Sequence, residues 1–106
     1  MIEVHVNFPA DGDATSVART AVEKRLAAAA NLLPGVRSHY WWEGSVRSAD
    51  EVRVVFKTSE TAADALVGFI EGAHPYRTPG IVVHKPIDAN QTYDDWVADV
   101  TDAGAP

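Results

Sequence analysis

The sequence predicts an α+β fold in which six elements follow one another as β-α-β-β-α-β, with a third helix after them. The period of the apolar residues switches repeatedly between two and about 3.6 along the chain. Prolines and acid-rich turns separate these segments. The 106 residues suffice for one core but not for two, so we expect a single domain over 1–106. This order is that of a ferredoxin-like sandwich, in which both inner helices cover one face of a four-stranded antiparallel sheet.

The first strand and the first helix are predicted from two different periods. Residues 2–8 alternate between apolar and polar side chains, as in a strand with one buried face. Proline, glycine and two aspartates interrupt this pattern at 9–13. Apolar residues then recur at helical spacing from Val17 to Ala30, which predicts a helix that ends near 31–34.

The middle of the chain predicts an unusually long hairpin. The stretch Val36–Arg47 has extended character, Ser48–Asp50 is expected to form the turn, and residues 51–57 form the second strand. About twelve residues exceed the usual strand length of about five or six. We therefore expect the far end of the hairpin to project beyond the helices and to pair with another molecule, most simply a second copy of the chain.

The last third of the chain repeats the pattern of helix and strand. Apolar residues at 63–73 predict a second helix, which must stop before Pro75 because the proline ring disfavours helical geometry in the preceding residue. The continuous apolar run 81–84 predicts the fourth strand. A third, shorter helix is expected over 92–100, and residues 102–106 are expected to form a loose tail.

The charge balance excludes several classes of partner. Fifteen acidic residues against nine basic ones give a formal net charge of −6, which argues against nucleic acid, whose phosphates are neutralised by basic residues. No apolar run approaches the roughly 18 residues that a membrane span requires. The start of the chain lacks the pattern of a secretory signal, and the sequence contains no cysteine. We therefore expect a cytoplasmic protein without a membrane or nucleic-acid partner.

A short aromatic segment contains two of the three tryptophans. Side chains alternate between the two faces of a strand, so Tyr40 and Trp42 should share one face, which we interpret as core or subunit interface. His39, Trp41 and Glu43 should share the other face. There the indole could line a cleft between subunits and stack on a planar ligand or attract a cation.

Several motifs occur in a specific order over nearly the whole chain. They are Arg25-Leu26-Ala27-Ala28, Asn31, Pro34-Gly35, Tyr40-Trp41-Trp42-Glu43-Gly44, Val54-Val55-Phe56-Lys57-Thr58, His74-Pro75-Tyr76 with Pro79, and Tyr93 with Trp96. In these motifs the chain resembles the CutA divalent-cation tolerance family. The resemblance implies a ferredoxin-like subunit in a compact homotrimer similar to the PII signalling proteins, with the long hairpin exchanging contacts between neighbours. It also implies a role in tolerance of copper and other divalent cations.

The departures from the family pattern concern the proposed metal ligands. Val6 and Ala29 stand where family members have cysteine, and His74 stands alone where some members have a pair of histidines. Arg77 and Gly80 replace two acidic residues of the family. Of the implied three-ligand set only His74 survives, so a thiolate site for Cu(I) is not expected.

The histidines and Tyr76 each leave two interpretations open. A lone histidine is more often a hydrogen-bonded structural residue than a ligand, and this alternative applies to His74 as it does to His5, His39 and His84. Trimerisation could still bring copies of one histidine together in a site for Cu(II), Zn or Ni. The hydroxyl of Tyr76 could anchor an inter-subunit cleft, or the ring could serve packing alone.

The sequence supports a binding function more than a reaction. It has no cysteine nucleophile, no Gly-x-Ser-x-Gly motif and no glycine-rich phosphate loop, so we assign no catalytic residue. The adjacent acids Asp50 and Glu51 are interpreted as complementing a turn. One function class is a trimeric, metal-responsive binding protein for copper or another divalent ion. The alternative is a PII-like trimeric sensor or scaffold that binds a small anion or a protein partner between subunits, without specific metal binding.

Overall fold

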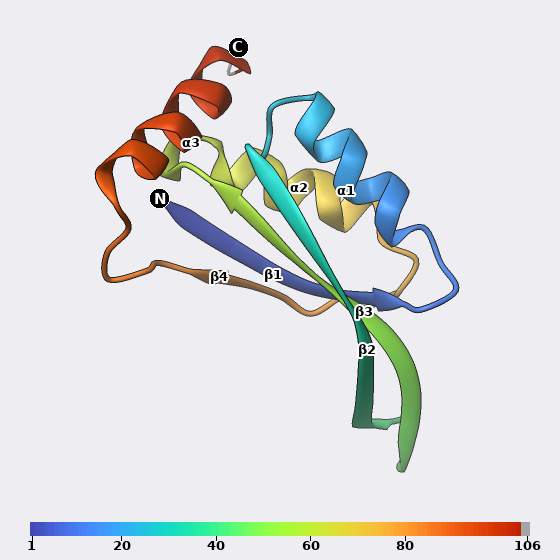
Figure 1. Ribbon diagram of the computed structural model, residues 1–106. Coiled ribbons are helices and arrows are strands. Elements are labelled where there is room, and N and C mark those ends of the chain that lie inside the picture. Colours follow the sequence, from blue (N-terminus) through green and yellow to red (C-terminus); the bar gives the residue numbers. More distant parts are fainter. Residues whose placement is uncertain (105–106) are drawn as a thin grey trace.

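The computed structural model describes residues 1–104 and confirms the predicted order of elements. Its four strands form one antiparallel sheet in the order β2-β3-β1-β4 (Figure 1). The elements are β1 (Ile2–Pro9), α1 (Ala14–Glu23), β2 (Ala29–Trp42), β3 (Ser45–Thr58), α2 (Glu60–Ala73), β4 (Ile81–His84) and α3 (Gln91–Gly104).

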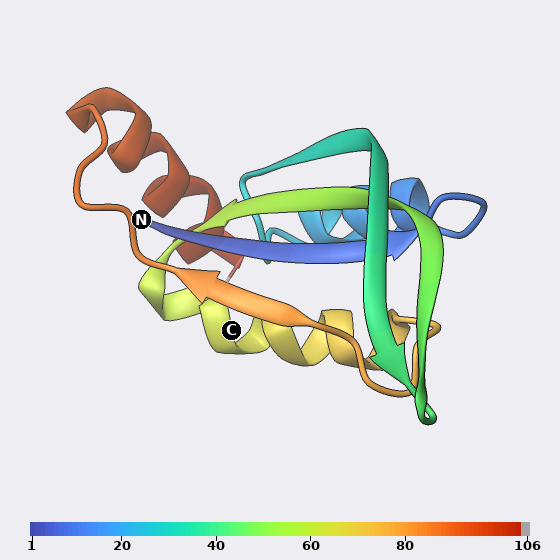
Figure 2. The same ribbon diagram turned by 90° about the horizontal axis from the view of Figure 1, so that it is seen from below.

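The core lies between the sheet and the helices α1 and α2, which cover the same face (Figure 1). Alternate residues of β1 and β3 point into it, as the period of two requires. The opposite face of the sheet carries the intervening polar residues, and no helix of residues 1–104 lies over it (Figure 2). The fully buried side chains of the strands and of α2 include Val4, Phe8, Phe56, Leu66 and Ile70.

Helix α1 is shorter than the sequence predicts. It ends at Glu23, although the helical spacing continues to Ala30. Arg25 adopts a left-handed backbone with φ 59°, and the N–H of Leu26 donates a 3.0 Å hydrogen bond to the carbonyl of Ala21. This hydrogen bond closes the last turn of the helix, and the chain reverses direction at Arg25. The predicted end of the helix near 31–34 is therefore wrong.

The residues after this reversal join the sheet. The N–H of Ala28 donates to the carbonyl of Lys57 at 2.8 Å, and Ala29 then pairs with Lys57 in the ladder between β2 and β3. Ala27 and Ala28 are buried. Burial at the edge of the sheet therefore explains why these positions carry apolar residues. Their helical spacing does not reflect a helix.

The turn of the hairpin lies nearer its aromatic segment than predicted. Glu43 and Gly44 form it, with φ of 50° and 81°, the two positive values of a two-residue type I′ turn. The expected turn at Ser48–Asp50 is wrong, because these residues lie in β3 and pair with Arg37–His39. The aromatic segment is therefore at the end of the hairpin and not in the middle of a strand.

The hairpin bends and then leaves the body of the subunit. Its register shifts between Leu33 and Val36, around Pro34 and Gly35, the second of which has a φ of 81°. A proline and a left-handed glycine interrupt the ladder, and the strand bends at such a bulge. Figure 1 shows the distal half of β2 and β3 extending away from both helices, which agrees with the expected projection.

The remaining elements follow the sequence closely. The side chain of Ser59 caps α2 by accepting from the N–H of Ala62 at 3.2 Å, and the helix ends before Pro75 as predicted. Strand β4 has the predicted bounds. Helix α3 continues to Gly104 through positions that the sequence assigned to a loose tail; the end of that expected tail, 105–106, lies outside the described residues.

Candidate functional site

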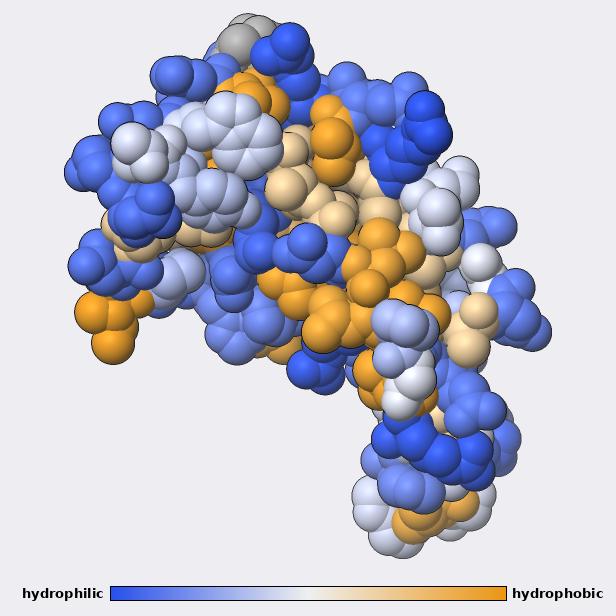
Figure 3. All heavy atoms as spheres, in the orientation of Figure 1, coloured by the Kyte–Doolittle hydropathy of each residue, from blue (hydrophilic) through white to orange (hydrophobic). Residues whose placement is uncertain are grey.

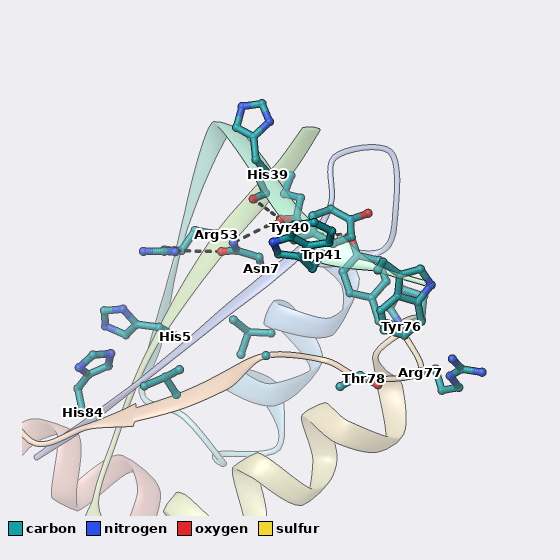
Figure 4. A pocket seen from close by; sticks show the side chains of 17 residues that line it. His5, Asn7, His39, Tyr40, Trp41, Arg53, Tyr76, Arg77, Thr78 and His84 are labelled. Carbon is teal, nitrogen blue, oxygen red and sulfur yellow. Dashed lines mark hydrogen bonds between the residues drawn. The ribbon is translucent and has the colours of Figure 1, made fainter. Parts of the chain in front are cut away.

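A cavity of about 860 Å³ opens on the uncovered face of the sheet. It lies between the hairpin, the middle of β1, and the connection from α2 to β4. Figure 4 shows that its aromatic residues gather at one end and a pair of histidines at the other. Its walls include His5, Asn7, Ser38, His39, Tyr40, Trp41, Trp42, Glu51, Arg53, Tyr76, Arg77, Val82 and His84.

His74 adjoins this cavity but is fixed by the backbone. Its Nε2 lies 2.7 Å from the carbonyl oxygen of Asn7, and its Nδ1 accepts from the N–H of Tyr76 at 3.1 Å. Because a carbonyl only accepts and an amide N–H only donates, Nε2 must carry the proton and Nδ1 the lone pair. The ring is buried and stacks on Phe8 with 4.4 Å between centroids.

This geometry argues against the expectation that His74 is a metal ligand. Nδ1 already uses its lone pair on Tyr76, and Nε2 uses its proton on Asn7. Binding of an ion would break one of these bonds and leave a buried backbone group without a partner, which costs about 1–3 kcal/mol. In this subunit His74 ties the start of the connection after α2 to β1.

Glu51 is the central polar side chain of the aromatic end, and it is only 6% exposed. Its carboxylate accepts from the hydroxyls of Ser38 and Tyr76, the latter at 2.7 Å, and from the side-chain amide of Asn7 at 3.4 Å. A buried carboxylate is tolerated when its oxygens are hydrogen-bonded in this way. The interpretation of Glu51 as a turn residue is therefore wrong.

Tyr76 closes a loop of interactions around this carboxylate. Its backbone N–H binds His74 and its hydroxyl binds Glu51. Burial raises the pKa of the Tyr76 hydroxyl, and so do the hydrogen bond to Glu51 and the negative charge of that carboxylate. The hydroxyl of Tyr76 therefore anchors a network within this chain, to which β1, β2, β3 and the connection after α2 all contribute; its role in an inter-subunit cleft stays a prediction.

The aromatic residues of the hairpin do not enter the core of the subunit. Tyr40 is 43% exposed and Trp41 is 74% exposed, while Trp42 is half-buried under the guanidinium of Arg77, which lies 5.1 Å from the ring centroid. The register places Tyr40 and Trp42 on the face of Ser38 and Glu51, as their alternation predicts. Of the two alternatives for that face, the core of the subunit is excluded.

His39 and Glu43 are not part of the Glu51 network. His39 is exposed, and its Nδ1 lies 2.8 Å from the hydroxyl of Ser48. Glu43 is exposed in the turn. Within residues 1–104, no group of three or more histidine, cysteine, aspartate or glutamate side chains is already arranged to hold a metal ion.

The family model of the CutA1 divalent ion tolerance protein matches residues 2–100. The chain belongs to this family. It is 35% identical to the Protein CutA homolog of Danio rerio over 99 residues, which are 92% of this chain and 66% of that relative. It is also 35% identical to the divalent-cation tolerance protein CutA of Thermus thermophilus over 98 residues, which are 92% of this chain and 95% of that relative.

The fold agrees with the same family. The crystal structure of CutA1 from Pyrococcus horikoshii superposes with a TM-score of 0.89 at 36% identity and covers 95% of this chain and 98% of that one. The chain therefore spans nearly all of these prokaryotic CutA proteins but about two thirds of the zebrafish relative. No helix in the described part of the chain is long and apolar enough to cross a membrane.

In this CutA1 chain, sequence reasoning missed the partners of the buried carboxylate. Asn7, Ser38 and Glu51 come from three strands, and no local motif joins them. The available signal was the parity of the strands. Alternation in β3 places Glu51 on the face opposite the core. Its burial on that face, which makes hydrogen-bond donors necessary, has no local signal.

Proposed function

We propose that this chain confers tolerance to divalent cations by binding them as a homotrimer, and that it catalyses no reaction. The observation that carries this proposal is the projecting end of the hairpin, which exposes apolar side chains in a member of the CutA1 divalent ion tolerance family. Its cytoplasmic location remains a prediction from the sequence.

The exposed end of the hairpin supports assembly with further copies. Trp41 and Val46 are directly opposite each other in the ladder and are 74% and 59% exposed. Figure 3 shows apolar and weakly polar atoms gathered at this end, beyond a strongly polar stretch. Strand β2 is also an edge of the sheet, so its outer backbone groups are available for a neighbouring strand. Three copies are proposed from the likeness to the PII-like trimers.

The residues available as ligands support a particular class of ion. The chain has no cysteine, so Cu(I), which prefers thiolates, is disfavoured. Imidazole and carboxylate remain, and they suit Cu(II), Zn and Ni. Near the aromatic end of the cavity, His74 and Glu51 are held by hydrogen bonds to the protein itself.

The alternative of an anion sensor without metal binding is not favoured. The matching family model and the Thermus thermophilus relative are named for divalent ion or cation tolerance. The aromatic end of the cavity also contains the buried carboxylate of Glu51, and a second negative charge beside it would be costly.

Sedimentation and calorimetry test the proposal together. We expect a species of about three times the subunit mass of 11.4 kDa, and micromolar or tighter binding of Cu(II), Zn or Ni by isothermal titration. Trp41→Ser should weaken assembly. Ile87→Ser is a matched control, because Ile87 is fully exposed outside the hairpin. If the wild-type protein sediments at the mass of one subunit, the proposed trimer is wrong. If none of the three ions gives a heat of binding in the titration, the proposed cation binding is wrong.

A further inference from the structure

Two histidines lie in contact on the uncovered face of the sheet, away from the Glu51 network. His5 belongs to β1 and His84 to the neighbouring strand β4, and their ring centroids are 4.1 Å apart with an angle of 43° between planes. Figure 4 shows the two rings side by side at the end of the cavity opposite the aromatic residues. They are diagonal neighbours in the ladder, because His84 pairs with Glu3 and His5 pairs with Val82.

A carboxylate completes this cluster. Glu3 lies directly opposite His84 and two residues before His5, so all three side chains share one face of the sheet. Its Oε1 is 3.1 Å from Nε2 of His5, and the two side chains are 29% and 25% exposed. The cluster is therefore accessible to solvent. Its backbone is fixed by the pairing of β1 with β4.

These groups have the chemistry of a transition-metal site. Two imidazoles and one carboxylate form a common ligand set for Zn, and imidazole also suits Cu(II) and Ni. Two nitrogens bound to one ion at about 2.0–2.1 Å are about 3 Å to 3.5 Å apart in tetrahedral or square geometry, a separation that adjacent rings can reach by side-chain rotation. No such set is pre-arranged within the described residues, so binding requires Glu3 to turn from His5 to the ion.

We infer that His5, His84 and Glu3 bind a divalent transition-metal ion of the Zn, Cu(II) or Ni class on the open face of the sheet. This inference rests on the proposed function and names the site that would perform it. The site differs from the single position, His74, that the family resemblance implies. It uses the only histidine pair in ring contact among the described residues, whereas the ring of His74 is occupied by the backbone.

Equilibrium dialysis with Zn(II) on the intact assembly tests this site. Wild type should bind about one ion per subunit, His5→Gln and His84→Gln should each weaken the affinity at least tenfold, and the double variant should bind none. His39→Gln is the matched control, since His39 is exposed on the hairpin and is hydrogen-bonded to Ser48. It should bind like wild type.

The outcomes separate this site from the proposed function. If the double variant retains wild-type affinity, the site is wrong while cation binding stands. If wild type binds no ion, both are wrong. Should the double variant fail to fold, Cu(II) electron paramagnetic resonance of wild type decides: splitting from two nitrogen ligands, with Glu3→Gln changing the spectrum, is the expected result. A spectrum without nitrogen splitting would overturn the site.

Discussion

The hydroxyl of Tyr76 donates a 2.7 Å hydrogen bond to Oε2 of Glu51, a residue 25 positions earlier in the chain. This contact joins the connection after α2 to the base of the long hairpin. Because Glu51 also accepts from Ser38 of β2 and Asn7 of β1, one carboxylate links the base of the hairpin to three other segments of the chain. The aromatic end of the hairpin, with Tyr40 and Trp41, lies outside the hydrophobic core.

Stability should fall in alkaline solution through Tyr76. The pKa of its hydroxyl in the folded chain is raised above the ordinary value of 10.0, first by burial and then by Glu51. The resulting stabilisation is complete below pH 10 or so, and it is lost as pH rises from there through the folded pKa, because only the unfolded chain ionises readily. Thermal melts between about pH 8 and pH 11 should therefore show a steeper loss for wild type than for Tyr76→Phe. Parallel curves would contradict the contact.

His74→Ala should destabilise the fold and leave cation binding in place. The substitution removes the bonds to Asn7 and Tyr76 and the stack on Phe8, which should cost about 2–3 kcal/mol in the free energy of unfolding. His39→Ala, at an exposed position, should change it by less than about 0.5 kcal/mol. Urea unfolding and titration with Zn(II) measure the two effects. A stable His74→Ala protein that no longer binds ions would restore His74 as the ligand.

The turn at the end of the hairpin should depend on its glycine. Gly44 has a φ of 81° and no neighbouring atom within 4 Å of the position that a Cβ would occupy, so Gly44→Ala should cost about 1–2 kcal/mol through backbone strain alone. Gly68→Ala is the matched control. Gly68 is exposed in the middle of α2 and also has open space around it, and there alanine should stabilise by about 0.5–1 kcal/mol. Urea unfolding that ranks the two variants the other way would exclude this turn geometry.

The order of elements could be predicted because it depends on local patterns. Alternation in β1, the proline after α2 and the apolar run of β4 each act within a few residues, and all three predictions are confirmed. The end of α1 and the turn of the hairpin depend on pairing instead. Residues near Ala28 join β3, and Ser48–Asp50 continue a strand because Arg37–His39 lie opposite them. Propensity did not reveal either pairing.

The candidate site was predictable only in part, for the same reason. Tyr40 and Trp42 could be assigned to one face from their alternation, whereas the contact of Tyr76 with Glu51 on that face could not be predicted. Glu51 gains its role from donors on β1, β2 and the connection after α2, and the structural alternative for His74 is favoured because a carbonyl of β1 lies at its ring. Such contacts between distant segments have no signature in the local sequence.

Native mass spectrometry in the presence of a slight excess of Zn(II) tests the central claim most directly, because one spectrum reports both assembly and ion content. The account predicts a dominant species of about 34 kDa, three times the subunit mass of 11.4 kDa, which carries about three zinc ions. A dominant species at the mass of one subunit, or a trimer without zinc, would contradict it.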